Sequence, residues 1–344
     1  MMGSVKTMHS LATLPCVETV IPEAEGVIPA HVFESETPVV IKGLLSGWPA
    51  VSAQGLDSME RYLSGFWIDR PVVAYVGSAS IGGRFSYDES LTGFNFKGGS
   101  AALPAVFERI REQGSTPSAM SIYVGSTPVD GWLPGFRAAN DIEVPAPDPL
   151  VSFWLGNQTR ISAHYDYPDN VACVVAGKRK FTLFPPEQIS NLYVGPIDKT
   201  PSGQAISLVD FAEPDFEKFP RFSEALQAGQ RAECEAGDAI FIPSLWWHHV
   251  ESLSEFNMLI NYWWIPERPT RATPAAALLH AILSVRDLPP RHKAGWKALF
   301  DYYVFQSGPE VYEHIPEPAR GPLGPLGEIE SKRLLADILN RLNQ

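Results

Sequence analysis

The residues of this chain best suited to hold a metal ion are a histidine and a carboxylate at short spacing, joined by a histidine from a later segment. His164 and Asp166 stand two residues apart in the run Ile161–Asp166. In an extended chain the side chains of residues i and i+2 point to one face about 7 Å apart, so both can bind one ion. A lone His-x-Asp pair also occurs on ordinary polar strand faces, so its context has to decide.

A third candidate ligand lies in the segment Gly237–Val250. A Gly-Asp turn leads into an apolar strand that ends at a proline, and two adjacent histidines, His248 and His249, follow. Neighbouring residues of a strand face opposite ways, so only one of them can join the pair above, and the periodicity does not say which. Two histidines and one carboxylate with open positions are the ligand set of non-haem Fe(II) oxygenases, whereas structural zinc prefers four closed, cysteine-rich ligands.

A basic residue on an apolar strand face is the next feature with chemical meaning. In the segment Gly177–Pro186, Arg179 shares a face with Phe181, while Lys178 and Lys180 share the opposite face. An unpaired buried guanidinium is costly, so Arg179 needs an anionic partner. A bound dicarboxylate meets that need with two hydrogen bonds. An Asp or Glu of the protein would meet it equally well.

An amide and an indole alternate together in the run Met258–Trp264. Asn261 and Trp263 share one face that is otherwise apolar. Buried amides require hydrogen-bond partners. A structural network explains this pair as well as a contact to a cofactor does.

The elements that must position these residues are strands in series. Between residues 150 and 264 the β-branched and aromatic runs are Val151–Leu155, Val171–Ala176, Lys180–Phe184, Ala239–Ile242 and Met258–Trp264. Strands joined by turns, without intervening helices, favour an antiparallel barrel or sandwich. Earlier in the chain we expect strands at Thr37–Gly43 and Arg70–Val76 and one amphipathic helix at Ala101–Gln113.

Taken together, the motifs HYD, GKRKFTLFPP, GDAIFIPSLWWHHVESL and NYWW resemble those of the JmjC/cupin-like (cupin_8) oxygenases, which include asparaginyl hydroxylases. The resemblance runs from about residue 38 to residue 264 and is weakest before residue 150. It implies an all-β core folded as a double-stranded β-helix (jelly-roll/cupin) barrel. Flanking N-terminal α/β elements and C-terminal helices complete the expected fold.

The resemblance also implies the site residues. The Fe(II) ligands are expected to be His164, Asp166 and His248, with His249 behind the site; the residues expected near the metal and 2-oxoglutarate are Tyr123, Asn170, Arg179, Asn261 and Trp263. Relatives usually carry a lysine at the position of Arg179, and arginine can form the same ion pair with the distal carboxylate. Ile161 stands where a relative has a threonine, whose role Ser162 or Thr182 could take.

The activity that the resemblance implies is a dioxygenase reaction using Fe(II), 2-oxoglutarate and O2. A protein side chain or a small amino-acid-like molecule would be hydroxylated, with release of succinate and CO2. One alternative is a catalytically silent cupin used as a binding module, which the intact ligands oppose. Another is a zinc or manganese cupin enzyme that does not use 2-oxoglutarate, which Arg179 opposes. Whether hydroxylation or demethylation results stays open.

Composition narrows the partners and the compartment. The net charge of the 344 residues is −12, which opposes the basic surface that a nucleic-acid partner requires. No apolar run is long enough to span a membrane, and the first twenty residues lack the apolar core of a secretory signal. Three cysteines in no metal-type spacing are expected to be buried free thiols in a reducing compartment, so we expect a cytoplasmic protein.

The chain is expected to divide into an N-terminal extension (1–30), a catalytic domain (31–266) and a C-terminal helical segment (267–344). Thr273 followed by Pro274 predicts a helix start. Apolar stripes follow at helical spacing: Leu278, Leu279, Ile282 and Leu283; Trp296, Leu299, Phe300 and Tyr303; Leu334, Leu335, Ile338, Leu339 and Leu342. These helices either pack on the barrel or join two subunits, so a homodimer is possible.

Overall fold

The computed structural model describes residues 10–114, 116, 119–201, 203–265, 273–306 and 308–343. It divides into two compact units, Met1–Ile265 and Pro266–Gln344, which we call the barrel unit and the C-terminal unit. The domain boundary expected at residue 266 falls outside the described residues. Each unit is considered by itself below.

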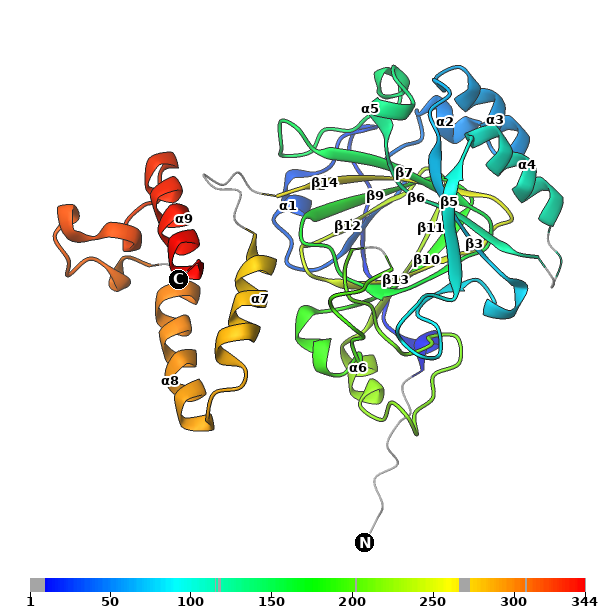
Figure 1. Cartoon of the computed structure of the whole chain (residues 1–344). Coiled ribbons are helices and arrows are strands. Elements are labelled where there is room, and N and C mark those ends of the chain that lie inside the picture. Colours follow the sequence, from blue (N-terminus) through cyan, green and yellow to red (C-terminus); the bar gives the residue numbers. More distant parts are fainter. Residues whose placement is uncertain are drawn as a thin grey trace, which may run out of the picture. The chain divides into compact units, whose positions relative to one another are not determined.

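Two β-sheets form the barrel unit (Figure 1). Among the described residues, the larger sheet has nine strands in the order β1-β2-β12-β9-β14-β7-β6-β3-β5, and the smaller has five in the order β11-β10-β13-β8-β4. Paired strands are antiparallel except for β1 with β2 and β4 with β8. The strands are β1 Glu18–Val20, β2 Val39–Ile41, β3 Val72–Gly77, β4 Arg84–Phe85, β5 Phe96–Ala101, β6 Ser121–Pro128, β7 Leu150–Gly156, β8 Arg160–His164, β9 Asp169–Ala176, β10 Lys178–Phe184, β11 Gln230–Glu235, β12 Ala239–Ile242, β13 Trp247–Ser252 and β14 Asn257–Trp264.

The continuous apolar run in β9 is explained by burial on both of its faces. Val171 and Cys173 belong to the core between the larger sheet and its helices, whereas Ala172 and Val174 belong to the core between the two sheets. A strand covered on both sides needs apolar residues at every position. The strands and the barrel expected from the sequence are confirmed.

Short helices cover the outer faces of both sheets. In the barrel unit they are α1 Ala30–Phe33, α2 Pro49–Ser52, α3 Leu56–Ser64, α4 Leu103–Gln113, α5 Val129–Trp132 and α6 Phe222–Ala228. The expected helix at 101–113 is α4, whose Phe107 and Ile110 enter the core behind the larger sheet. On the other side, Phe222 of α6 packs with Phe184 of the smaller sheet.

The segment expected to be an N-terminal extension contributes to the larger sheet. β1 pairs in parallel with β2, and Val17 and Ile28 are buried. Cys173 and Cys234 are buried free thiols, but Cys16 is exposed, so the expectation of three core cysteines is wrong for Cys16. Cys16 lies just before β1 and makes only an isolated bridge, and its neighbour Val17 takes the inward position.

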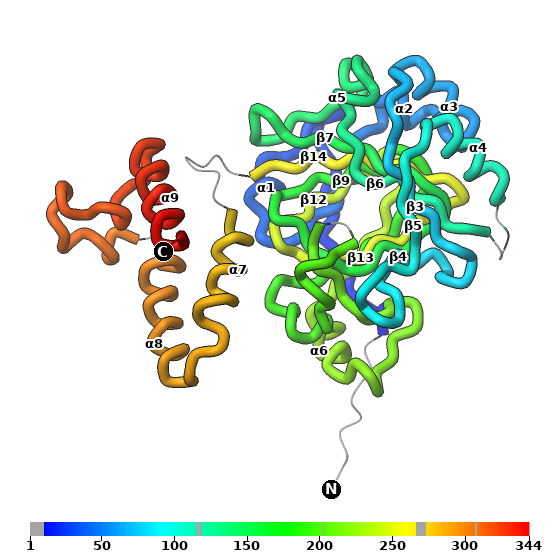
Figure 2. The backbone as a smooth tube through the Cα atoms, in the orientation of Figure 1, coloured from blue at the N-terminus to red at the C-terminus, as the bar shows by residue number. Residues whose placement is uncertain are grey.

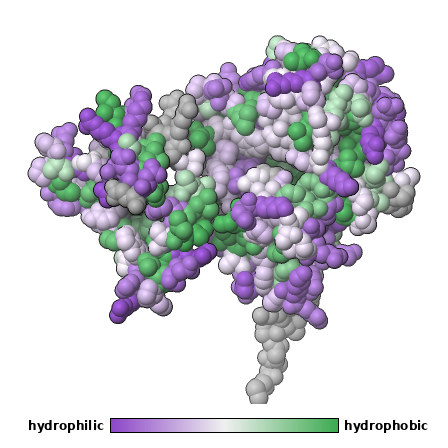
Figure 3. All heavy atoms as spheres, in the orientation of Figure 1, coloured by the Kyte–Doolittle hydropathy of each residue, from purple (hydrophilic) through white to green (hydrophobic). Residues whose placement is uncertain are grey.

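The C-terminal unit is helical, as expected. It contains α7 Pro274–Val285, α8 Pro290–Phe300, a π-helical turn at Asp301–Phe305 and α9 Glu328–Leu342. The Thr273 side chain accepts a hydrogen bond from the backbone N–H of Ala276, which confirms the predicted helix start. Apolar side chains are plentiful on its surface (Figure 3). In the part of the chain that is described, no helix is long and apolar enough to cross a membrane.

Candidate metal and co-substrate site

Strands β8 and β13 bring the three candidate metal ligands together. His164, at the end of β8, lies opposite His248 of β13, and their ring centroids are 4.3 Å apart. Asp166 follows two residues beyond the strand end. Ligand atoms of the three residues all lie within 4.8 Å of one another. The donor set and its spacing fit one divalent ion.

The structure shows which of the two adjacent histidines faces the cavity, and β8 is bulged beside it. His248 pairs with His164, whereas Val250 pairs with Ile161, so β8 has one residue more than β13 in this interval. A bulge of this kind re-aims the side chains beside it. His248, Val250 and Ile161 line the same cavity, and His249 does not.

Both histidines of the triad are oriented through their Nδ1 atoms. Nδ1 of His164 lies 2.9 Å from the carbonyl oxygen of Ser162, and Nδ1 of His248 lies 3.0 Å from that of Trp246. A carbonyl can only accept, so each Nδ1–H donates and each Nε2 is left with its lone pair. Burial, aided by the neighbouring His164, lowers the pKa of His248, which keeps its ring neutral and able to bind a metal.

A hydrogen-bond network holds Asp166 in place. Its backbone oxygen accepts from the N–H of Leu245 at 2.8 Å. Its Oδ2 accepts from Nε1 of Trp263 at 3.1 Å and from Nδ2 of Asn170 at 3.4 Å. Asn261 donates in turn to Oδ1 of Asn170 at 2.6 Å. The amide and indole that the sequence placed on one face of β14 therefore belong to a network behind the carboxylate.

Arg179 lines the same cavity and is only 3% exposed. Lys178 and Lys180 point outward, to Glu235 at 2.7 Å and Glu251 at 2.9 Å. Among the described residues Arg179 has neither a carboxylate nor another hydrogen-bond partner, so the internal ion pair left open by the sequence is not found there. Burial lowers the pKa of Arg179 to about 10, and it stays charged at neutral pH.

Tyr123 and Trp154 line the cavity and stack on each other. Of these two, the sequence had indicated only Tyr123 as a site residue. Burial raises the pKa of Tyr123 although the charge of Arg179 opposes this rise. Trp154 of β7 stacks on Tyr123 at 5.8 Å and meets Trp263 edge to face at 5.7 Å. The Nε1–H of Trp154 is buried and has no partner among the described residues. The signal that could have pointed to it is its alternation with apolar neighbours in the predicted strand Val151–Leu155.

The cavity has a volume of about 520 Å³ and extends well beyond the metal ligands. Ile161 forms part of its wall, and the hydroxyl of Ser162 donates to the carbonyl oxygen of Phe85 at 3.1 Å. Thr182, the other residue considered as a threonine replacement, is buried but does not line the cavity.

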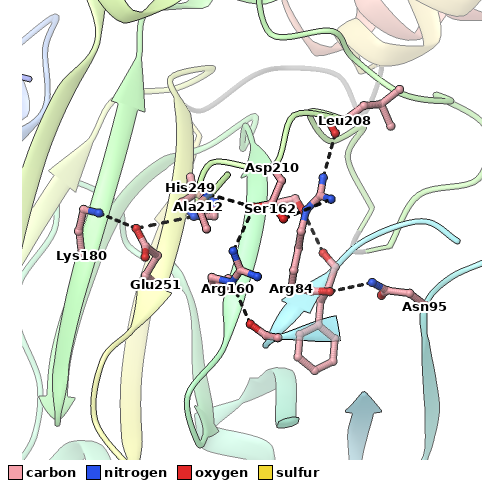
Figure 4. Close-up of polar contacts among 12 residues, drawn as sticks. Arg84, Asn95, Arg160, Ser162, Lys180, Leu208, Asp210, Ala212, His249 and Glu251 are labelled. Carbon is pink, nitrogen blue, oxygen red and sulfur yellow. Dashed lines mark hydrogen bonds and ion pairs between the residues drawn. The ribbon is translucent and has the colours of Figure 1, made fainter. Parts of the chain in front are cut away.

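A polar cluster beside β8 anchors the connection from β10 to α6; Figure 2 traces this connection and Figure 4 shows the cluster. Pro201, Gly203 and Ile206 of the connection line the cavity. Asp210 of this connection lies 3.0 Å from Nη1 of Arg160 and 3.8 Å from Nη1 of Arg84. Two strands of the smaller sheet therefore hold the connection in place. No sequence pattern pointed to this cluster.

His249 lies beside that cluster rather than in the cavity. Its ring is 4.7 Å from the ring of Phe211, and its Nε2 is 3.9 Å from Oε1 of Glu251 (Figure 4). Burial and then the charges of Arg160 and Lys180 lower the pKa of His249 to about 3. Its ring is therefore neutral and packs as part of the layer behind the candidate ligands.

Comparison with known proteins matches this chain to one family of domains and to parts of several longer relatives. The model of the cupin-like domain matches residues 27–269. Lysine-specific demethylase JMJ31 of Arabidopsis thaliana is 37% identical over 115 residues, covering 33% of this chain and 20% of that protein. The tRNA wybutosine-synthesizing protein 5 of Gallus gallus is 31% identical over 179 residues, covering 45% and 52%. Lysine-specific demethylase 8 of Xenopus tropicalis is 24% identical over 272 residues, covering 73% and 56%. The chain thus spans from a fifth to just over half of these relatives.

Proposed function

We propose that this chain, which belongs to the JmjC/cupin-like family of Fe(II)- and 2-oxoglutarate-dependent oxygenases, hydroxylates a protein side chain or a small amino-acid-like molecule. Succinate and CO2 would be the co-products. The proposed iron ligands are His164, Asp166 and His248, which meet in one cavity.

The observation that carries this proposal is a charged, unpaired arginine in the same cavity as the three ligands. Arg179 is buried, and its Nε has no partner among the described residues. A buried guanidinium without a counter-ion is costly, so an anionic ligand is implied. Arginine binds carboxylates through two parallel N–H···O bonds, and 2-oxoglutarate offers such a carboxylate at the end remote from the metal.

Each group of the site would have a distinct role. Iron, when bound with 2-oxoglutarate and O2, supplies the oxidising chemistry that places a hydroxyl group on a C–H bond. Asp166 would be kept in position by the donors of Trp263 and Asn170. Arg179 and the hydroxyl of Tyr123 would hold the distal carboxylate, and the apolar walls would keep water from the reacting atoms.

Replacement of Arg179 tests the proposal. Arg179→Ala should lose 2-oxoglutarate affinity while keeping iron, and Arg179→Lys should retain part of it. Loss of a charge-assisted pair in a desolvated pocket costs about 2–5 kcal/mol, or tens- to thousands-fold in binding. The readout is the weak visible absorbance of the anaerobic complex with Fe(II), titrated with 2-oxoglutarate.

Lys178→Ala and Lys180→Ala are the matched controls, because both side chains point outward to glutamates. Each should change 2-oxoglutarate binding by less than about 1 kcal/mol. If Arg179→Ala titrates like the wild type while Lys180→Ala does not, Arg179 is not the anchor.

The ligand assignment is tested by comparing the two adjacent histidines. His164→Ala, Asp166→Ala and His248→Ala should abolish tight Fe(II) binding, whereas His249→Ala should weaken it less. Equilibrium dialysis under argon measures the stoichiometry, expected to be one iron per chain. Iron retained by His248→Ala but lost by His249→Ala would reverse the assignment.

We also propose that the chain forms a homodimer through its C-terminal unit. Leu278, Leu279 and Leu283 of α7 are between 53% and 82% exposed, and α8 and α9 carry further exposed apolar residues. Apolar surface of this extent is stabilised when another surface covers it. A second copy offers the same apolar surface, as a two-fold symmetric interface requires.

We also propose that the protein is located in the cytoplasm. The three cysteines are all unpaired, and two of them are buried. Free thiols persist where the environment is reducing. Fractionation of cells that express the full-length chain tests this.

A further inference from the structure

The cavity keeps a second region after the metal and 2-oxoglutarate residues are set aside. Its wall there consists of Val73 and Tyr75 of β3, Phe96 of β5, and Gly125 and Ser126 of β6. Pro201, Gly203 and Ile206 of the β10-to-α6 connection also line the cavity. Among the described lining residues, charged side chains occur only in the metal triad and at Arg179. A charged substrate group would find no counter-ion of its own here.

Tyr75 has an unusual setting in this region. A Cβ atom added to Gly98 of β5 would lie 2.9 Å from Cε1 of Tyr75, and one added to Gly125 of β6 would lie 2.9 Å from Cε2. Cε1 and Cε2 are opposite edges of the ring, so the ring is seated edge to edge between two neighbouring strands. The same ring lines the cavity and lies 6.5 Å from the ring of Tyr123, with an angle of 30° between the two planes.

The two glycines are explained by space and not by backbone conformation. Neither Gly98 nor Gly125 has a positive φ. A glycine inside a strand often marks a place where another group approaches closely. Here that group is the Tyr75 ring, which would have to rise from the sheet if either position carried a side chain. The hydroxyl of Tyr75 has no hydrogen-bond partner among the described residues.

We propose that Tyr75 selects the substrate, and that an aromatic side chain of a polypeptide packs against its ring in the cavity. This inference rests on the proposed oxygenase function and names the substrate class of the same cavity. Aromatic rings gain most from offset stacking or edge contacts, and the seat between Gly98 and Gly125 holds the Tyr75 ring in the cavity wall, where a substrate ring can make such a contact. Phe96 meets Tyr75 edge to face at 5.4 Å and closes one side of the seat.

The charge of the barrel unit favours a polypeptide over a nucleic acid. This unit contains 17 Lys and Arg residues against 30 Asp and Glu residues. A phosphate backbone would be repelled by such an excess of acidic groups.

Small probes test this selectivity directly. The full chain is loaded with Zn(II) and 2-oxoglutarate, which do not react, and titrated by ligand-observed NMR. The probes are N-acetyl-phenylalaninamide, its cyclohexylalanine analogue of similar size, and N-acetyl-trimethyllysinamide. We expect the phenylalanine probe to bind about five- to tenfold more tightly than the other two, as one aromatic pair supplies.

Variants on one strand provide a matched pair. Gly98→Ala should displace the Tyr75 ring and weaken the phenylalanine probe about as much as Tyr75→Leu does. Gly99→Ala should leave it unchanged, because a Cβ at Gly99 meets nothing within 4 Å. Tyr75→Phe should keep the binding. All four should bind 2-oxoglutarate like the wild type, which also reports that they are folded.

Several outcomes would overturn the inference. They are equal binding of the planar and non-planar probes, tighter binding of trimethyllysine, equal effects of Gly98→Ala and Gly99→Ala, or Tyr75-dependent binding of a tRNA. Any of these in a chain that binds Zn(II) and 2-oxoglutarate refutes the substrate class alone. Tyr75-dependent probe binding in a chain that binds neither metal nor 2-oxoglutarate would refute the oxygenase function and retain the aromatic site.

Discussion

The barrel unit and the C-terminal unit differ in how far their apolar side chains are buried. The barrel unit distributes its large side chains over three buried clusters, and Phe153, Leu155 and Tyr262 are completely buried. In the described part of the C-terminal unit, Val311 is the one buried apolar side chain. Their charges differ as well, since the C-terminal unit has ten basic and nine acidic residues. The barrel unit has a core of its own, whereas the described helices of the C-terminal unit leave most of their apolar side chains exposed.

The largest expected effect is a difference in stability between replacing a buried leucine of the barrel unit and replacing an exposed leucine of the C-terminal unit. Leu155 of β7 is 0% exposed and Leu283 of α7 is 82% exposed. Leu155→Ala should lower the free energy of unfolding of the barrel by about 2–5 kcal/mol, because it leaves a cavity. Leu283→Ala should change stability by less than about 0.5 kcal/mol in a monomer. Urea denaturation measures both, and equal effects would remove the distinction between the units.

Two aspartates, one in each unit, extend the comparison to charged side chains. Asp238 is buried and accepts from the backbone N–H groups of Gly43 at 3.0 Å and Glu235 at 2.9 Å, and from Nζ of Lys42 at 2.7 Å. Asp238→Ala would leave these donors unpaired and should cost about 2–4 kcal/mol. Asp301 of the C-terminal unit pairs with Lys297 in the open, so Asp301→Ala should cost less than about 1 kcal/mol in the same denaturation experiment.

The proposed homodimer contact is tested by replacing exposed leucines of α7. Leu279 and Leu283 are four residues apart and lie on one helix face. A double replacement by glutamate should raise the dissociation constant of the proposed homodimer at least about tenfold, which corresponds to about 1.4 kcal/mol. Sedimentation equilibrium measures it, with Leu253→Glu on the barrel as the control for an exposed leucine. A wild-type chain that sediments as a monomer at every concentration contradicts the proposal.

The smallest expected effect concerns the start of α7. Thr273 accepts a hydrogen bond from the N–H of Ala276 at 3.3 Å. Thr273→Ala should destabilise the first turn of the helix by about 1 kcal/mol, and Thr273→Ser should not. Hydrogen exchange of the α7 amides reads this out, while the barrel amides serve as the internal reference. Unchanged exchange in Thr273→Ala would show that the cap does not contribute.

Much of the barrel could be predicted because its signals are local. The strands between residues 150 and 264 were visible as β-branched runs, and alternation within β10 separated Arg179 from its neighbouring lysines. The start of helix α7 was predicted from its capping threonine and first-turn proline. The exposure of Cys16 was not predictable, because the residue type suggests burial and the edge of the sheet decides otherwise.

Other features depend on strands that are distant in sequence. The choice between His248 and His249 follows from the pairing of β13 with β8 and β10, which no pattern within β13 contains. The seat of Tyr75 combines β3, β5 and β6, and its two glycines look like strand-weakening residues when the sequence is considered alone.

The sequence by itself determined which residue types face together along each strand, because side-chain alternation is a property of the extended backbone. It thereby supplied the His-x-Asp pair, the apolar face of Arg179 and the shared face of Asn261 and Trp263. Only the tertiary structure decided that Arg179 lacks a carboxylate among the described residues. It also decided that Trp263 donates to Asp166 directly, while Asn261 is linked to Asp166 through Asn170. Such pairings depend on strand order and register, which are set by packing between sheets and not by any one segment.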